Sequence, residues 1–426
     1  MAFRRDNSDV RSVMHRAGSF SQPASAIVLR AGLALLASTL GAVGVCAAAS
    51  RAVQSCSHAF VTNAGSDTVS VIDVGTNEVV TTVRLSADEN VCRGDTVPNV
   101  LGLTDIVVAP NGAFAYVSSK GCAVFVLLIG TNDIVGKIVL AKEPVGPVTF
   151  GPDSAIAYIG GSGAVTSIDT ATNAIVDQIA IGKNPIALAL SVRAAALYVL
   201  TDEGVSVVDT RTKSVTSSVA LPGSPNAMAL APNGRSIYVA SLPKSVSVID
   251  AATGVVTATI LVGQSPSSLA VTPDGGHVYV TGDPLSVIDT RTNIVAATID
   301  LPNSRGIAMR SDGSAAYVTN GVDSVSVVST SSNSVTTTIA VPDCGLNADP
   351  TAPCIPTGVA IAEHACDPTP ASTASGASAG KSGGCAVGSS RLGTGAAIAI
   401  LLPFVVVGWR SQLRFAARRE HLPRGW

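Results

Sequence analysis

Five aspartates at regular spacing are the first residues of this sequence that could do chemistry. Each ends a short apolar run, and most recur about every 40 residues: Asp73, Asp169, Asp209, Asp250 and Asp289. Paired carboxylates can act as general acid and base, but equivalent copies spread along a repeat cannot converge on one substrate. An aspartate that ends a strand can instead accept backbone N–H groups of the following turn. The residues four positions later would lie in that turn: Asn77, Asn173, Lys213, Gly254 and Asn293. We therefore interpret the aspartates as structural.

Motifs of metal, haem and nucleophile chemistry are missing between residues 56 and 366. Of the three histidines there, His58, His277 and His364, the first and last could become neighbours. Two histidines without a carboxylate cluster nevertheless make a poor metal site. No C-x-x-C-H, G-x-S-x-G, P-loop or H-E-x-x-H motif occurs in this stretch. We therefore expect a protein that is not an enzyme, and we assign no catalytic, cofactor-binding or metal-binding residue.

The elements that would position these residues are short strands in a sevenfold repeat. An aromatic residue followed by Val or Ile recurs at intervals near 40 residues, with one interval of 56: Phe60, Tyr116, Tyr158, Tyr198, Tyr238, Tyr279 and Tyr317. Each copy holds four runs of alternating polarity separated by turn residues; in the sixth copy they are 268–272, 277–282, 285–289 and 294–301. A repeat of about 40 residues with four strands is typical of a propeller blade. The sequence therefore predicts an all-β, seven-bladed β-propeller with four-stranded antiparallel blades.

Two segments of the repeat carry a family resemblance. They are AFVTNAGSDTVSVIDVGTNEVVTTVRL from residue 59 and AYVTNGVDSVSVVSTSSNSVTTTI from residue 316. This text resembles the YVTN family of surface and periplasmic propellers, and the resemblance covers residues 59 to 363. It implies the propeller fold and says little about function. A WD40 propeller is disfavoured because the two tryptophans, Trp409 and Trp426, both lie in the C-terminal tail.

The N-terminus has the features of a secretory signal. Residues 31–49 form an apolar run that follows five arginines, and the alanines at 47–49 supply a small-residue cleavage site. We interpret residues 1–49 as a signal peptide. The alternative is an N-terminal anchor that is not cleaved.

The C-terminus has three parts that together predict anchoring. Residues 367–384 have the Ser, Gly, Ala and Pro composition of a flexible stalk. Residues 385–426 begin at Cys385 and contain an apolar segment at 395–409, which would form a transmembrane helix, followed by an Arg-rich cytoplasmic tail. This end resembles the MYXO-CTERM sorting signal, which implies processing near Cys385 and display on the cell surface. A plain C-terminal membrane anchor is the alternative.

The charge of the region between these ends is acidic. Residues 50–384 carry 16 Lys and Arg against 26 Asp and Glu. An acidic surface repels a phosphate backbone, so we expect no nucleic-acid partner.

The predicted ring requires strands from both ends of the repeat region. The first copy lacks a preceding inner strand, and the last inner strand, 356–363, has no further copy of its own. Three N-terminal strands and one C-terminal strand would therefore complete one blade of a propeller that spans residues 56–366. An even number of six cysteines in an exported domain implies disulfides. Positions in the propeller favour the pairs Cys56–Cys366, Cys92–Cys122 and Cys344–Cys354.

Polar residues near the start of the inner strands form the candidate ligand site. They are Asp105, Asn226, Ser267, Arg305 and Thr357. Two inserts, near 86–100 and at 343–354, connect outer strands to inner strands and should emerge on the same face. A small-molecule funnel at the axis is one interpretation of these residues, and solvated rim charges are the other.

These features favour an exported, surface-anchored, non-enzymatic binding or scaffolding propeller that presents disulfide-closed loops on one face. Its partner would be a surface protein or polysaccharide, and its C-terminal anchor would hold it in the membrane at least transiently. One alternative is an enzyme, a lactonase-like hydrolase that uses the central funnel and needs a metal or an acid/base pair there. Another is a structural component of the cell envelope.

Overall fold

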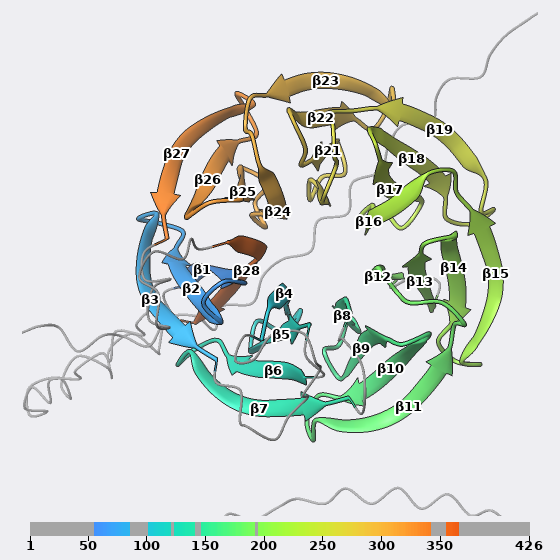
Figure 1. Cartoon of the computed structure of the whole chain (residues 1–426), viewed down its shortest axis with the longest axis horizontal. Helices are drawn as coiled ribbons and strands as arrows, with labels where there is room; N and C mark the ends of the chain where they lie inside the picture. The colour runs from blue at the N-terminus through green and yellow to red at the C-terminus, as the bar shows by residue number, and fades with distance from the viewer. Residues whose placement is uncertain are drawn as a thin grey trace, which may run out of the picture. The chain divides into compact units, whose positions relative to one another are not determined.

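The computed structural model describes residues 55–85, 101–120, 123–140, 146–191, 195–341 and 355–365. These residues form 28 β-strands in seven four-stranded antiparallel sheets. The chain divides into two units, residues 1–369 and 370–426, and every described residue belongs to the first. The predicted seven-bladed propeller is confirmed (Figure 1).

The strands of each blade run from the axis outward in the following order. Blade 1 holds β28 (Pro356–Ala365), β1 (Ser55–Asn63), β2 (Thr68–Asp73) and β3 (Glu78–Arg84). Blade 2 holds β4 (Leu103–Val108), β5 (Phe114–Ser119), β6 (Ala123–Leu128) and β7 (Asp133–Val139). Blade 3 holds β8 (Val148–Phe150), β9 (Ile156–Gly161), β10 (Ala164–Asp169) and β11 (Ala174–Ala180). Blade 4 holds β12 (Ala187–Ser191), β13 (Ala196–Thr201), β14 (Gly204–Asp209) and β15 (Ser214–Ala220).

Three further blades complete the ring. Blade 5 holds β16 (Ser224–Leu230), β17 (Ser236–Leu242), β18 (Ser245–Asp250) and β19 (Val256–Leu261). Blade 6 holds β20 (Leu269–Val271), β21 (His277–Val280), β22 (Leu285–Asp289) and β23 (Ile294–Ile299). Blade 7 holds β24 (Ser304–Met309), β25 (Ala315–Asn320), β26 (Ser324–Ser329) and β27 (Ser334–Ala340).

The ring closes through blade 1, which the two ends of the repeat region share. β28 pairs antiparallel with β1, with His364 opposite Cys56 and Ala360 opposite Phe60. The inner strands contact one another in the cyclic order β28, β4, β8, β12, β16, β20, β24 and again β28. Figure 1 shows the blue β1 beside the red β28 in this blade. Three N-terminal strands and one C-terminal strand thus form one sheet, as the repeat predicted.

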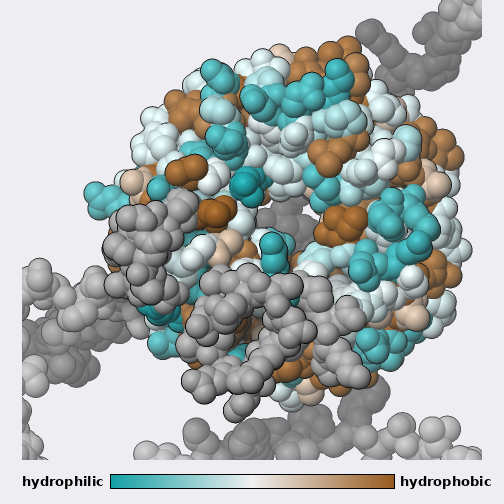
Figure 2. Space-filling view, in the orientation of Figure 1, coloured by the Kyte–Doolittle hydropathy of each residue, from teal (hydrophilic) through white to brown (hydrophobic). Residues whose placement is uncertain are grey.

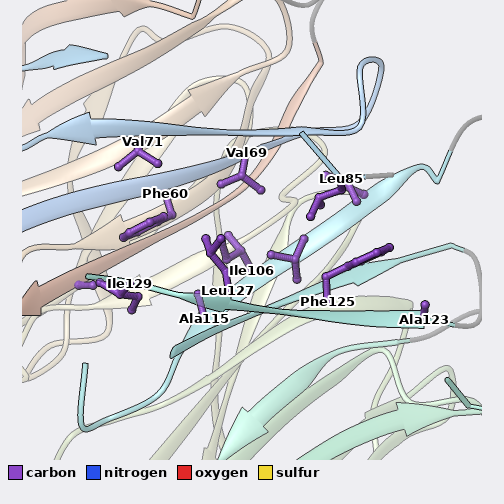
Figure 3. Close-up of a cluster of buried hydrophobic side chains, with 13 residues drawn as sticks. Phe60, Val69, Val71, Leu85, Ile106, Ala115, Ala123, Phe125, Leu127 and Ile129 are labelled. Atoms are coloured by element: carbon purple, nitrogen blue, oxygen red, sulfur yellow. The ribbon is translucent and has the colours of Figure 1, made fainter. Parts of the chain in front are cut away.

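Neighbouring blades pack small residues of one inner strand against large residues of the next. Ala227 and Ala229 of β16 join the cluster that contains Leu269 of β20. Met228 and Leu230, on the other face of β16, join the cluster on the side of blade 4. Figure 3 shows the cluster between blades 1 and 2, where side chains of β1 and β2 meet those of β4 to β6. This alternation lets the sheets approach closely near the axis, where space is smallest.

The five regularly spaced aspartates end third strands and organise the hairpins that follow. Asp250 Oδ1, for example, accepts the backbone N–H groups of Ala252 and Thr253 at 3.1 and 2.8 Å. The Thr253 hydroxyl also donates to this oxygen, and these hydrogen bonds hold the pKa of Asp250 below its ordinary value. The residues four positions after the aspartates all have positive φ, between 55° and 69°: Asn77, Asn173, Lys213, Gly254 and Asn293. The structural interpretation of the aspartates is confirmed.

The repeated tyrosine ties four of the blades to the outer hairpin of the next blade. Its hydroxyl donates from Tyr116 to Asn173 Oδ1 (2.9 Å), from Tyr198 to the Ala251 carbonyl (3.2 Å), from Tyr279 to Asn333 Oδ1 (2.5 Å) and from Tyr317 to Asn77 Oδ1 (2.6 Å). The rings are buried, and a buried phenol requires a hydrogen-bond partner. The tyrosine therefore adds a polar bond to an otherwise apolar contact between blades.

Blade 1 lacks this bond because its aromatic residue is Phe60. Phe60 lies in the cluster between blades 1 and 2, with Ile129 close by (Figure 3). Asn132, which follows Ile129 in the hairpin of blade 2, has positive φ like the other hairpin asparagines. Its Oδ1 is buried and finds no hydrogen-bond donor. An unpaired buried acceptor costs about 1–3 kcal/mol.

We expect the tyrosine bond to be transferable to blade 1. Tyr317→Phe should lower the free energy of unfolding by about 1–2 kcal/mol, because Asn77 Oδ1 loses its donor. Phe60→Tyr should raise it by up to about 1 kcal/mol, because we expect the new hydroxyl to donate to Asn132 Oδ1 as that of Tyr116 donates to Asn173 Oδ1. Denaturant unfolding of both variants measures the two effects. A destabilised Phe60→Tyr protein would show that the pocket around Phe60 has no room for a hydroxyl.

Two histidines lie at the ring closure. The rings of His58 on β1 and His364 on β28 stack with their centroids 4.9 Å apart. His58 Nε2 lies 4.0 Å from Asp73 Oδ2, so one carboxylate does stand beside the pair, which the sequence analysis did not foresee. Burial lowers the pKa of both histidines; Asp73 opposes this effect at His58, and the neighbouring His58 adds to it at His364.

These lowered pKa values make an acid-dependent loss of stability the expected behaviour. The unfolded chain takes up protons at histidine near pH 6.5, whereas the folded protein takes them up only at lower pH. Above pH 6.5 the contribution of the pair to the free energy of unfolding therefore does not depend on pH. As the pH falls below 6.5, the pair destabilises the folded protein. His364→Phe keeps an aromatic ring, and its stability should fall less between pH 7.5 and pH 5 than that of the wild type.

Thermal unfolding across that pH range measures the difference. His277→Gln is the matched control, because His277 begins β21, away from the closure, and should follow the wild type. An equally steep loss of stability in His364→Phe and in the wild type would refute the role of the pair.

Several sequence predictions fall on residues outside the described ranges. These are the signal peptide at 1–49, the stalk at 367–384, the C-terminal segment at 385–426 with Cys385, and the pairs Cys92–Cys122 and Cys344–Cys354. Cys56 is disulfide-bonded, but its expected partner Cys366 also lies outside these ranges. Within the described ranges, no helix has the length and hydropathy needed to cross a membrane.

Candidate functional site

A cavity of about 640 Å³ lies at the axis of the ring. Each of the seven blades contributes to the cavity wall, through its inner strand or the residues directly before that strand. Figure 2 shows the hollow at the centre of the ring, with hydrophilic and hydrophobic residues on its border. Its volume is within the range of small-molecule binding sites.

Irregular pairing near the start of the inner strands gives this cavity its polar residues. In blade 7, Arg305 and Gly306 of β24 stand opposite the single residue Thr319 of β25, and in blade 1 Thr357 and Gly358 stand opposite Thr62. Such a bulge interrupts the ladder and redirects side chains. We call the residues at the first bulge position and its equivalents the collar: Thr104, Gly146, Ile186, Asn226, Ser267, Arg305 and Thr357.

Buried hydroxyl groups compensate for the interrupted ladder. The backbone N–H of Gly306 donates to Thr319 Oγ1 at 2.8 Å, and Thr319 Oγ1 donates to the Thr357 carbonyl of blade 1 at 3.2 Å. In blade 1 the N–H of Gly358 donates to Thr62 Oγ1 at 2.8 Å. The hydroxyl on the second strand therefore holds the collar in place and, in blade 7, links it to the neighbouring blade.

The structure brings all five candidate ligand-binding residues to this one cavity. Asn226, Ser267, Arg305 and Thr357 belong to the collar, and Asp105 stands one position after the collar residue Thr104. The Ser267 hydroxyl is already bound to carbonyls of Ser304 and Arg305, and the Thr357 hydroxyl to the carbonyls of Thr62 and Leu103. These two residues hold the wall together, which leaves Asp105, Arg305 and Asn226 as the polar side chains best able to meet a ligand.

Asp105 has a longer side chain than the residues at the equivalent positions of the other blades. The equivalent residues of the other blades are small or cyclic: Pro147, Ala187, Ala227, Ser268, Gly306 and Gly358. A Cβ atom on Gly358 would lie 3.0 Å from the Asp105 Cα and 3.1 Å from its Oδ1. The carboxylate of blade 2 thus fits only because blade 1 has a glycine here.

This environment makes the Asp105 carboxylate energetically costly. Burial raises the pKa of Asp105 to about 6, although the N–H of Ile106, which donates to its Oδ1 at 2.8 Å, partly opposes the effect. Among the described residues, no cation forms an ion pair with it, and its Oδ2 accepts no hydrogen bond from the chain. At neutral pH the cavity therefore holds a carboxylate with one oxygen free for a ligand.

Arg305 supplies the opposite charge on the other side of blade 1. Its side chain is exposed, and its Nε lies 3.3 Å from the position that a Cβ of Gly321 would take. In the described part of the chain it forms no ion pair. The guanidinium therefore keeps its donors available at the collar.

Apolar residues form the remaining wall and were missed by the sequence analysis as part of the site. They follow the collar along the inner strands: Val107, Leu188, Met228, Leu269, Ile307 and Val359. The signal that could have predicted them is the alternation of side chains along a strand, because residues two positions apart face the same side. Within the described ranges, no group of three or more His, Cys, Asp or Glu residues could hold a metal ion. The cavity can thus bind a partly apolar molecule and contact it with two opposite charges.

The fold and this cavity define the class as a seven-bladed β-propeller with a charged axial site. Its fold is similar to that of hydrazine synthase from Kuenenia stuttgartiensis, with a TM-score of 0.51 and 20% identity over 56% of this chain and 79% of that one. It is also similar to the dihydro-heme d1 dehydrogenase NirN in complex with DHE, with a TM-score of 0.51 and 13% identity over 71% of this chain and 74% of that one. At these identities the likeness concerns the fold alone.

Two further comparisons add no family. No protein-family model matches the sequence. A search of curated proteins gives no match either.

Replacing the costly carboxylate should stabilise the protein. A carboxyl whose pKa rises from 3.8 to about 6 on folding costs the folded state up to about 3 kcal/mol at neutral pH. This cost is present above pH 6 and disappears as the pH falls towards the unfolded value, because both states are then protonated. Asp105→Asn should therefore be about 1–3 kcal/mol more stable than the wild type at pH 7.5 and nearly equal to it at pH 4.

Denaturant unfolding at the two pH values measures this difference. Asp300→Asn is the matched control, since Asp300 is exposed and its replacement should change little at either pH. A loss of stability in Asp105→Asn at pH 7.5 would mean that the carboxylate is needed for the fold.

Proposed function

We propose that this protein is an exported binding module, displayed outside the cell by its C-terminal anchor, whose propeller takes a ligand in the axial cavity. The observation that carries the proposal is the unpaired Asp105 carboxylate in the wall of that cavity. A buried charge without a partner destabilises a fold, and a ligand that pairs with it removes this cost. The signal peptide predicted at 1–49 and the anchor predicted at 395–409 support the exported location.

The positions of the two inserts in the chain indicate on which face of the propeller a ligand enters the cavity. They leave from the ends of the outer strands β3 and β27 and return at the starts of β4 and β28. The collar lies at these same starts of the inner strands. A surface protein or polysaccharide that binds near these strand ends would approach the propeller on the face where the collar lies.

A hydrolase that uses the cavity is the second candidate. It is favoured by the pKa of Asp105 at about 6, because a general base works best when its pKa lies near the operating pH. The two solved structures named above carry enzyme names, but their identity with this chain is too low for an activity to be transferred. The two candidates differ in whether the bound molecule is changed.

The proposal is tested with the full-length protein and the small-molecule fraction of a cell extract. We expect this fraction to raise the thermal unfolding temperature of the wild type and of Asp300→Asn, and to have little effect on Asp105→Asn. Mass spectrometry of the mixture after incubation should then recover the ligand unchanged. Conversion of the ligand, abolished in Asp105→Asn, would establish the hydrolase instead, and an equal response of all three proteins would refute an axial site.

A further inference from the structure

Two side chains alone carry charge among the described residues that line the axial cavity. They are Asp105 from blade 2 and Arg305 from blade 7. Blade 1, with Thr357 in the collar, stands between them. Among the described residues the two are not paired with each other or with any other charged group.

This separation constrains the charge of a ligand. A simple cation that pairs with Asp105 would be repelled by Arg305. A simple anion that pairs with Arg305 would be repelled by Asp105. A molecule with both charges can satisfy both side chains, and it brings no net charge into the cavity. Arg305 offers the forked donors that suit a carboxylate, and the free Oδ2 of Asp105 suits an ammonium group.

The wall beyond the collar constrains the remainder of the ligand. Its side chains are mostly apolar, among them Val107, Met228, Leu269, Ile307 and Val359, with Thr149 and Ser268 between them, so a mainly apolar body fits it best. A cavity of about 640 Å³ can accept more than one amino-acid unit. Size, wall and charges together fit a short apolar peptide or amino acid with free termini.

We infer that the axial cavity binds a small zwitterionic ligand with an apolar body, with its ammonium group at Asp105 and its carboxylate at Arg305. This inference rests on the proposed axial binding function and specifies its ligand class. Protonation of Asp105 weakens the ammonium contact, so affinity falls as the pH drops below about 6.

The test uses titration calorimetry of the full-length protein with leucine, leucyl-leucine and leucyl-leucyl-leucine at pH 7.5. We expect saturable binding of at least one of them, with one molecule per chain. For the best of the three, N-acetylation and C-terminal amidation should each weaken binding about tenfold or more, because each removes one charged contact.

Two variants show which side chain contacts which end of the peptide. Each should lose the preference for one free terminus and keep the preference for the other. Asp105→Asn should bind the free and the N-acetylated peptide alike while it still discriminates against the amide. Arg305→Gln should show the reverse pattern. Asp300→Asn and Arg235→Gln, which change exposed charges away from the cavity, should behave as the wild type.

Other outcomes separate the two levels of the proposal. No saturable binding of any of the three probes overturns the zwitterion inference, and so does equal binding of the free and capped forms. If the extract fraction still stabilises the wild type but not Asp105→Asn, the axial binding function stands and only the ligand class is wrong. If neither the extract nor the peptides bind, both proposals fail.

Discussion

The pairing of β28 with β1 is the interaction on which the propeller depends. It joins residues far apart in the chain, as the bond between the hydroxyls of Thr62 and Thr357 at 3.0 Å shows, because these residues are 295 positions apart. Bringing such distant segments together costs on the order of 5 kcal/mol of chain entropy. The ladder bonds of β1 and β28 and the apolar contacts of blade 1 offset this cost together.

The same closure completes the candidate site. Thr357, Gly358 and Val359 of β28 line the cavity between the positions of Asp105 and Arg305. The crowding that raises the pKa of Asp105 includes Gly358, which comes from the other end of the propeller. The electrostatic character of the site therefore exists only when the ring is closed.

The periodic features of the chain could be predicted from the sequence because they are local. The number of blades follows from the recurrence of the aromatic residue, and the turn role of the aspartates follows from their place at strand ends. The five candidate ligand residues were also located correctly at the axis, because the start of each inner strand must face it. Whether they bind a ligand is a separate matter of chemistry.

Features that depend on the approach of distant residues could not be predicted in this way. Asp73 lies beside His58 only because β1 and β2 pair in a particular register. Asn132 Oδ1 has no donor beside a blade whose aromatic residue is Phe60, and the availability of Arg305 depends on which carboxylates the fold leaves near it. Sequence patterns give the strand and the face of such residues, but not the distance between blades.

The cavity wall contains charges that the ring does not need for its own packing. At the position of Asp105, the other blades all satisfy the demand for a small or cyclic residue, and the hydroxyl bonds of Thr62 and Thr319 hold the collar without help from a charge. A small neutral residue would therefore complete blade 2 with less strain and without the desolvation of a carboxylate. Neither the ladder nor the packing between blades uses the free oxygen of Asp105 or the guanidinium of Arg305. Since both residues line the space that the ring encloses, we propose that their charges serve a molecule bound there.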